Sequence, residues 1–224
     1  DVASITGEIC CDNGESIVVW SEDFSIPEIA NNNKHADWLE DNGDKIVKNH
    51  GYVPGENAGV MDGHYAVTSN TSAIRNGTGI LADRYDHTSN DGSGGFLFVN
   101  VGATAVNALL FEKLITGFCE EIPYNFSLWL LQVEGYGVDA NLRFEIEAEL
   151  TDGTNKILAN RPTGTIMKET NDDNDQWRKY GVSFTVPKNT DKLYLRVYNF
   201  SSSGDGNDLC FDDLVLSACQ PTLS

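Results

Sequence analysis

The stretch from Tyr85 to Asn100, YDHTSNDGSGGFLFVN, gathers acids, a histidine and glycines directly before an apolar run. Adjacent Asp86 and His87 are residue types that transfer protons or bind metal ions, and Asp91 follows closely. The glycines, asparagine and serines are equally typical of a turn that leads into a strand. The residues alone therefore allow two interpretations, a chemical site or a turn.

Catalytic patterns are weak elsewhere in the chain. The sequence contains no G-x-S-x-G motif, and nothing selects one Ser-His-Asp set from its four histidines. A glycosidase needs two carboxylates that face each other across a cleft, and 34 acidic residues single out no pair. Glu145, Glu147 and Glu149 alternate along one run, as on the outer face of a strand. We expect a non-catalytic protein and keep a jelly-roll glycan-degrading enzyme as a minor alternative.

Two pairs of adjacent acids are more selective. Glu22 and Asp23 close an early strand-like run, and Asp212 with Asp213 interrupts the apolar run LCFDDLVL. Neighbouring residues of a strand face opposite sides, so one of the two aspartates must point toward a packed interior. A buried carboxylate is costly without a partner, and Ca²⁺, which prefers oxygen ligands, would remove the cost. In a two-sheet β-sandwich the first and last strands are usually neighbours. In such a fold the pair Glu22 and Asp23 should therefore lie near the pair Asp212 and Asp213. Polar caps at strand ends are the alternative explanation.

The elements that must position these residues are strands. Helical periodicity is almost absent, and about nine β-rich runs are separated by Gly, Asn, Asp and Pro clusters. Within NLRFEIEAEL, apolar and polar residues alternate strictly, as in a half-buried antiparallel strand. We predict an all-β fold, a two-sheet antiparallel jelly-roll β-sandwich. Residues 1–224 would form a single domain, with a long loop excursion at 28–63 and a loop or hairpin at 152–176.

Charge excludes some partners. The net charge is −19, from 34 acidic and 15 basic residues, and such a surface repels phosphate backbones. No apolar run approaches the ~20 residues of a membrane-spanning helix. We therefore expect no nucleic-acid partner and no membrane insertion. Excess carboxylates also suit divalent cations, although an acidic surface that serves only solubility explains the total charge as well.

The order of several motifs resembles a known family. The motifs EDF, DHTSNDGSGGFLFVN, CEEIPYNFSLWLLQVEG, QWRKYGVSFTV and GNDLCFDDLVLSAC follow one another between about Val18 and Cys219. This order is similar to the MAM-like jelly-roll modules of secreted and surface proteins of Gram-negative bacteria. The resemblance implies a galactose-binding-like jelly-roll sandwich, similar to those of carbohydrate-binding modules. It also implies a structural Ca²⁺ held by Glu22 or Asp23, by Asp86, and by Asp212 or Asp213.

Further implications concern the cysteines and the location. The resemblance pairs Cys119 with Cys219 in a disulfide, whereas the partners of Cys10, Cys11 and Cys210 stay open. Five cysteines without a C-x-x-C pair favour an oxidising compartment over a zinc site. We expect a secreted or cell-surface protein, with lipid anchoring through a removed N-terminal segment as one arrangement.

Members of the resembled family adhere, bind glycans or space other domains, so we expect a calcium-stabilised extracellular module that binds a glycan or a cell-surface or host protein. A purely structural or adhesive domain is the alternative. Sugars stack on exposed aromatic rings. We expect such rings at Trp38, Tyr52, Tyr85 and Tyr136, which lie in loops or at strand ends. The tryptophans within the strand-like runs are expected in the core.

Overall fold

Strict alternation produces two of the central strands of the protein. In β8 (Ala140–Leu150), Leu142, Phe144 and Ile146 are fully buried, and the residues between them are only half-buried. The same period shapes β11 (Thr190–Asn199), whose Leu193, Leu195 and Val197 are buried. Each strand therefore gives one face to the core and its other face to the exterior.

The structure is a computed structural model, and it describes residues 16–25, 44–45, 51–52, 62–71, 84–102, 106–133, 137–166, 177–202 and 206–219, with only the backbone at 44, 45, 51, 52, 64 and 219. Besides β8 and β11, the strands are β1 (Ser16–Glu22), β2 (Asp44–Lys45), β3 (Gly51–Tyr52), β4 (His64–Thr68), β5 (Phe96–Asn100), β6 (Leu109–Ile115), β7 (Pro123–Gln132), β9 (Asn155–Ile166), β10 (Arg178–Thr185) and β12 (Leu209–Cys219).

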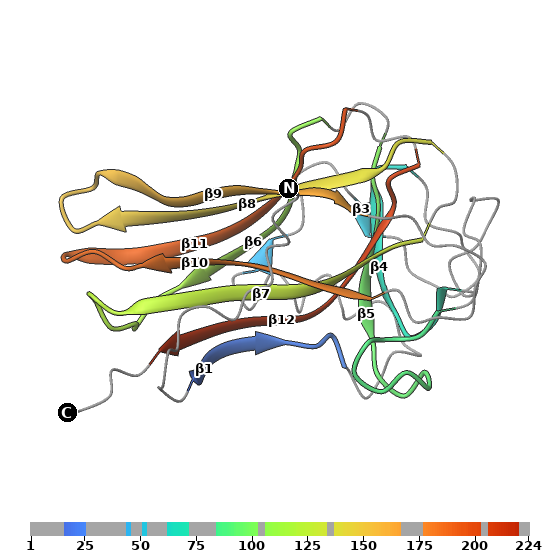
Figure 1. Cartoon of the computed structure of the whole chain (residues 1–224), viewed down its shortest axis with the longest axis horizontal. Coiled ribbons are helices and arrows are strands. Elements are labelled where there is room, and N and C mark those ends of the chain that lie inside the picture. The colour runs from blue at the N-terminus through green and yellow to red at the C-terminus, as the bar shows by residue number, and fades with distance from the viewer. Residues whose placement is uncertain are drawn as a thin grey trace.

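These strands form two sheets that pack face to face, as the predicted β-sandwich requires (Figure 1). Sheet A has seven strands in the order β10-β7-β12-β5-β4-β3, with β1 also paired to β12. Sheet B has five strands in the order β2-β6-β11-β8-β9. The pairs are antiparallel except β3–β4, which is parallel. The all-β class and the two antiparallel layers are confirmed.

The last strand occupies the middle of sheet A. Along one edge β12 pairs with β7, and along the other it pairs first with β5 and then with β1. The first and last strands are therefore neighbours, as predicted, and Glu22 lies opposite Leu214. The pairing with β7 shifts register between Asp212 and Val215, and Asp213 has a φ of 46°. The paired aspartates thus sit in a bulge, where a strand bends and re-aims its side chains.

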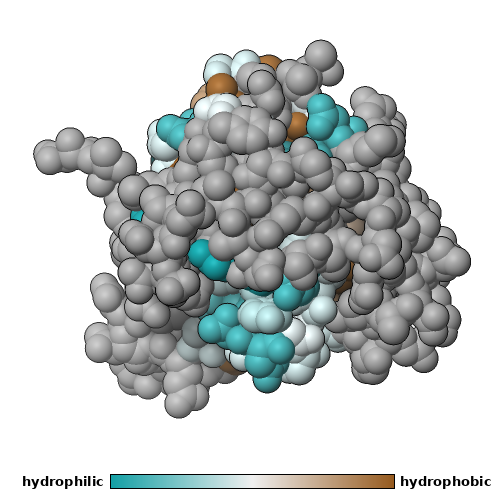
Figure 2. All heavy atoms as spheres, turned by 90° about the vertical axis from the view of Figure 1, so that its right-hand side faces the viewer, coloured by the Kyte–Doolittle hydropathy of each residue, from teal (hydrophilic) through white to brown (hydrophobic). Residues whose placement is uncertain are grey.

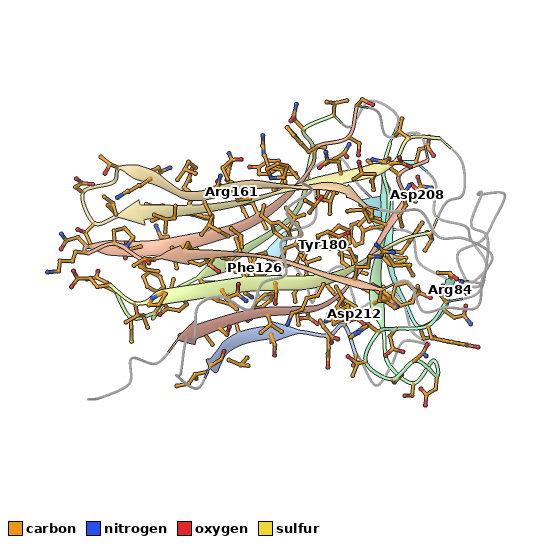
Figure 3. The ribbon with its side chains drawn as sticks, in the orientation of Figure 1. Arg84, Phe126, Arg161, Tyr180, Asp208 and Asp212 are labelled. Carbon is orange, nitrogen blue, oxygen red and sulfur yellow. The ribbon has the colours of Figure 1, made fainter. Side chains whose placement is uncertain are left out.

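Aromatic and aliphatic side chains fill the space between the sheets. Phe126 of β7 (Figure 3) meets Phe144 of β8 edge to face, with ring centroids 5.8 Å apart. A second, smaller cluster lies on the opposite face of sheet A, where Phe96 and Phe98 pack with Trp177. Trp177 is buried in this second cluster and partly buried Trp129 packs against it, whereas Trp20 of β1 is partly buried against the main core.

The segments expected as loops contain strands. The predicted loop at 28–63 includes β2 and β3, and the rest of it lies outside the described residues. The predicted loop or hairpin at 152–176 includes β9, which pairs with β8. Within the described ranges, no helix is long and apolar enough to cross a membrane.

Candidate functional site

The outer face of sheet B carries an ion-paired network centred on Arg196 of β11. Its Nε donates to Oε2 of Glu112 on β6 at 2.7 Å. Its Nη1 lies 3.4 Å from Oε1 of Glu145 and 3.3 Å from Oε1 of Glu147, both on β8. The guanidinium also lies over the ring of Tyr194, 4.8 Å from the centroid. One arginine therefore links three neighbouring strands.

Register explains this arrangement. Arg196 is opposite Glu112 on one side and Glu145 on the other. Directly opposed cross-strand residues have Cβ atoms about 5 Å apart, so opposite charges meet without distortion. Burial alone would lower the pKa of Arg196, but the hydrogen bond to Glu112 and the charges of Glu147 and Glu112 raise it above the ordinary value.

Tyrosines flank this network along β11. The Tyr194 hydroxyl donates to Oε2 of Glu149 at 3.0 Å, and Lys192 donates to the other oxygen of the same carboxylate at 2.7 Å. These two hydrogen bonds lower the pKa of Glu149. Burial, and then the hydrogen bond to Glu149, raises the pKa of Tyr194. The tyrosine hydroxyl is therefore a neutral donor near pH 7 and is fixed in place.

An aromatic and cationic cluster occupies the far end of the same strand. The Arg143 guanidinium on β8 lies over the ring of Tyr198 at 4.7 Å and over that of Phe200 at 5.6 Å. The Tyr198 hydroxyl donates to Oε1 of Glu145 at 3.3 Å. Phe200 is 42% exposed, so much of its ring is open to solvent.

A different cluster anchors the loop that contains Asp86 and His87. The backbone N–H of His87 donates to Oδ2 of Asp212 at 2.8 Å, and its ring Nδ1 lies 2.6 Å from Oδ2 of Asp213. The Thr88 hydroxyl donates to the other oxygen of Asp213 at 2.6 Å. The His87 ring also stacks on Trp129, with centroids 3.7 Å apart. The loop is thereby bonded to the bulge in β12.

Asp86 is bonded within its own loop. Its two oxygens accept hydrogen bonds from the Ser89 N–H at 2.6 Å and the Ser89 hydroxyl at 2.7 Å. A Cβ on Gly94 would lie 2.4 Å from Oδ2 of Asp86, so the carboxylate packs directly on the glycine. Asp86 and Asp212 are both 0% exposed. Burial, and then the charge of Asp213, raises the pKa of Asp212 to about 8.

The expected calcium ligands are only partly brought together. Asp86, Asp212 and Asp213 belong to one cluster, and Glu22 is close by in the register of β1 and β12. Glu22 instead accepts the N–H of Phe24 at 2.7 Å, and exposed Asp23 accepts that of Ser25. Among the described residues, no three His, Cys, Asp or Glu side chains are arranged so that they could hold a metal ion.

The chemistry of this cluster still suits a cation. No lysine or arginine of the described residues bonds to Asp86 or Asp212, although both are fully buried. Each carboxylate oxygen that accepts one hydrogen bond keeps a second lone pair. Oxygen donors with an uncompensated negative charge are what Ca²⁺ prefers. The donor set therefore fits calcium, whereas the arrangement of the described side chains is that of a hydrogen-bonded cluster.

The aromatic residues expected to bind sugar do not form a described platform. Trp38 and Tyr136 lie outside the described residues, and only the backbone of Tyr52 is described, on β3. Tyr85 is 37% exposed, and its carbonyl accepts the Trp177 indole N–H at 3.1 Å. Seen from the side that faces the viewer in Figure 2, the described residues that reach the surface are mainly hydrophilic.

The expected disulfide between Cys119 and Cys219 is not formed in this structure, in which the Cys119 thiol is free and exposed. Cys119 lies in the connection between β6 in sheet B and β7 in sheet A. The Tyr124 hydroxyl fixes this connection, because it bonds to both the N–H and the carbonyl of Cys119, at 2.9 and 3.0 Å. A local hydrogen bond thus holds the segment without a crosslink.

Sequence reasoning did not select the outer face of sheet B as a binding site. The alternation in KLYLRVYNF places Tyr194, Arg196 and Tyr198 on one face, and Glu145 and Glu147 share a face of β8. The signal for this candidate face was the presence of two aromatics and an arginine at alternate positions of one strand. Alternation alone does not distinguish such a face from any other polar strand face, because the carboxylates that complete it come from other strands.

Comparisons with known proteins identify the fold and the family. The chain is similar to the CBM22-1 xylan-binding domain of Paenibacillus barcinonensis Xyn10C, with a TM-score of 0.52 and 12% identity over 93% of this chain and 97% of that one. Its similarity to the CBM22-1–CBM22-2 tandem domain of the same protein has a TM-score of 0.52 and 11% identity, over 96% and 49% of the two chains.

The match to the CBM22-1–GH10 modules of Clostridium thermocellum xylanase 10B covers 63% of this chain but 25% of that one, with 11% identity and a TM-score of 0.44. No curated protein sequence matches significantly. The sequence profile described as carbohydrate binding domain matches residues 68–203, more than half of the chain, and the MAM-like assignment is not confirmed. The chain belongs to the carbohydrate binding domain family.

Proposed function

We propose that this protein is a non-catalytic module that binds a glycan on the outer face of sheet B. The observation that carries the proposal is the row of Tyr194, Arg196 and Tyr198 on β11, continued by exposed Phe200. Aromatic rings offer flat apolar surfaces to the C–H faces of pyranoses. Guanidinium and carboxylate groups beside them supply the donors and acceptors that sugar hydroxyls need.

The same geometry favours binding over hydrolysis. A glycosidase needs room between its two carboxylates for the glycosidic oxygen, and for a water molecule in the inverting mechanism. Here the Arg196 guanidinium lies between Glu112 and the pair Glu145 and Glu147. A guanidinium in that position occupies this room and favours the charged form of every carboxylate that it contacts. A general acid, which must carry a proton, is thereby disfavoured.

The proposal is tested by measuring glycan binding with isothermal titration calorimetry and affinity electrophoresis. Xylan is the first probe, because the Paenibacillus barcinonensis domain is a xylan-binding domain, and β-glucan, mannan and host glycans follow. We expect Tyr198→Ala and Phe200→Ala to weaken binding about tenfold or more, since loss of a stacked aromatic costs on the order of 1–3 kcal/mol. Val18→Ala, at an exposed position of β1, is the control.

One further variant separates the two candidate surfaces. Tyr85→Ala removes the described member of the loop aromatics and leaves sheet B intact. Unchanged affinity in this variant, together with losses at Tyr198 and Phe200, supports the sheet B face. The reverse pattern would move the site to the loop. Binding to no member of a broad glycan panel would leave the adhesive or structural alternative, which the exposed Ile17, Val18 and Val19 on β1 favour.

We also propose that a structural Ca²⁺ stabilises the junction of the 84–95 loop with β12. Asp86, Asp212 and Asp213 would supply oxygen ligands, with Glu22 from β1. The support is the burial of Asp86 and Asp212 without a basic partner among the described residues. Such an ion would offset the negative charge and fix the loop on sheet A. It would stabilise the fold and take no part in sugar contact.

A secreted or cell-surface location is the third proposal. The sequence supports it through its five cysteines without a C-x-x-C pair. Mass spectrometry of thiol-alkylated protein purified from its native host, with and without reduction, tests this location. Five alkylated thiols without reduction would argue for a reducing compartment. The MAM-like resemblance stays a prediction on the motif order alone.

A further inference from the structure

Two arginines on the outer face of sheet B have different surroundings. Arg196 is within 3.4 Å of the carboxylates of Glu112, Glu145 and Glu147. Arg143 approaches a single carboxylate, with its Nη2 4.0 Å from Oε2 of Glu145. Its Nε is buried and has no hydrogen-bond partner. Arg196 is therefore neutralised by the protein, whereas Arg143 has one distant carboxylate neighbour and an Nε that nothing in the described part of the chain satisfies.

The surroundings of Arg143 hold its guanidinium in place. Its central carbon lies 4.7 Å from the ring centroid of Tyr198 and 5.6 Å from that of Phe200. Across the sheet, Arg143 is opposite Pro162 of β9. Contacts with two aromatic rings orient the guanidinium and remove part of its hydration. An oriented, partly desolvated guanidinium binds a planar acceptor with two oxygens better than it binds a single hydroxyl.

The site is also open to a ligand. The Arg143 side chain is 22% exposed and Phe200 is 42% exposed. Phe200 thus offers a stacking surface beside the partly exposed Arg143 side chain. The other end of β11 has the opposite character, because Glu149 and Asp191 both contact Lys192 there. A chain with one acidic unit would be repelled at that end and attracted at Arg143.

We propose that Arg143 and Phe200 form a subsite for a uronic acid, so that the glycan bound by this face carries carboxylate-bearing sugar units. The carboxylate would accept hydrogen bonds from the guanidinium while the pyranose ring stacks on Phe200. The acidic unit would also set the direction of the glycan along β11. This inference rests on the proposed glycan-binding function and adds the chemical class of its ligand.

The overall charge of the protein opposes an acidic ligand but does not by itself decide whether such a ligand binds at Arg143. The net charge is −19, yet exposed charges are screened beyond about 8 Å at physiological salt. A direct pair between carboxylate and guanidinium acts at contact distance and is weakened much less. Binding should therefore grow weaker at low salt through the long-range repulsion, while selectivity for the acid at fixed salt reports the short-range pair.

The test compares two probes that differ in one group. The first is a xylo-oligosaccharide with a single glucuronic acid branch, and the second is the same molecule after reduction of its carboxyl to a hydroxymethyl group. We expect the wild-type protein to bind the acidic probe about tenfold more tightly, as one charge-assisted bidentate pair permits. Arg143→Gln should bind both probes equally, with the affinity of the wild type for the neutral one.

Two further variants make the test specific. Arg161→Gln removes the same charge from β9, where exposed Arg161 (Figure 3) is opposite Phe144, a residue of the main core. It should keep the tenfold preference. Arg143→Lys keeps the charge without the two-donor fork and should show a smaller preference. Thermal unfolding of each variant shows that it is folded.

The outcomes separate this inference from the function on which it rests. Equal binding of both probes by wild type overturns the uronate subsite and leaves glycan binding intact. If Arg143→Gln still prefers the acidic probe, the uronate subsite is overturned as well, because another group would then recognise the carboxylate. Binding of neither probe, nor of any other glycan, removes the proposed function together with this inference. If Arg143→Gln does not fold, the comparison of Arg143→Lys with wild type decides.

Discussion

Asp212 provides the sharpest test of the buried acidic cluster. Its carboxyl is 0% exposed, and burial with the nearby charge of Asp213 raises its pKa to about 8. In the unfolded chain an aspartate has a pKa of about 3.9. The folded state without a cation therefore holds a proton that the unfolded state releases. The contribution of the Asp212 carboxyl to the free energy of unfolding is fully present below about pH 3.9, and it is lost as the pH rises through 8.

The size of the effect follows from the pKa difference. A shift from about 3.9 to about 8 corresponds to an upper limit on the order of 5 kcal/mol, of which about 4 kcal/mol is lost by pH 7. Asp212→Asn removes this penalty. An amide has one oxygen, however, and Asp212 accepts the N–H groups of both His87 and Asp213. Loss of one acceptor costs about 1–3 kcal/mol. We expect a net gain of about 1–3 kcal/mol at pH 7 in EDTA.

Thermal unfolding at pH 5 and pH 7, in EDTA and in excess Ca²⁺, measures both the cost of burying the Asp212 carboxyl and the stabilisation by calcium. In EDTA at pH 7 the variant should unfold several degrees higher than wild type, since 1 kcal/mol shifts the midpoint of a chain this size by about 2–4 °C. At pH 5 this difference should narrow. Asp191→Asn, which neutralises an exposed acid, should change little at either pH.

In excess Ca²⁺, wild type should unfold at a higher temperature than Asp212→Asn, which reverses their order in EDTA. A ligand at a hundred times its Kd stabilises the folded state by about 2.7 kcal/mol, and Asp212→Asn lacks one of the proposed ligands. Wild type should therefore gain more from Ca²⁺ than the variant does. A variant that is less stable than wild type in EDTA at pH 7 would refute the cost assigned to burial. A wild-type midpoint unaffected by removal of metal would refute the calcium site.

Three other substitutions test the packing around the two surfaces. Gly94→Ala should destabilise the protein by about 1–3 kcal/mol in urea unfolding, because its Cβ would lie 2.4 Å from Oδ2 of Asp86. Arg196→Gln should cost about 1–3 kcal/mol, because the carboxylates that it links then repel one another, and added salt should recover part of the loss. Phe126→Ala should cost about 3–5 kcal/mol and unfold at lower urea, since the ring is fully buried.

Local periodicity allowed the sandwich to be predicted. Alternation in NLRFEIEAEL determines which residues of β8 are buried, whatever the partner strands are, because strand side chains alternate between faces. The adjacent acids at 212 and 213 likewise predicted a carboxylate inside the protein, and Asp212 is fully buried. Both inferences need only the residues of one strand.

The proposed binding face on sheet B could not be predicted from the residues of one strand. Arg196 bonds to Glu112, 84 residues earlier in the chain. That contact depends on the register of β6 against β11, which a bulge near Val197 alters. Likewise, the contact of His87 with Asp213 spans 126 residues. Sequence patterns specify which face of a strand is polar, but register between distant strands decides which polar groups meet.

The acidic character of the chain has two separate roles in this structure. On sheet B, carboxylates from two strands hold Arg196, and through it the ring of Tyr194, before any ligand arrives. A face fixed in this way loses little side-chain entropy on binding, which is where preorganised sites gain affinity. On sheet A, Asp212 and Asp213 fix the 84–95 loop against the strand. Because the two groups lie on different sheets, removal of the proposed calcium ion should change stability while the proposed sugar-binding face stays ordered, as long as the fold persists.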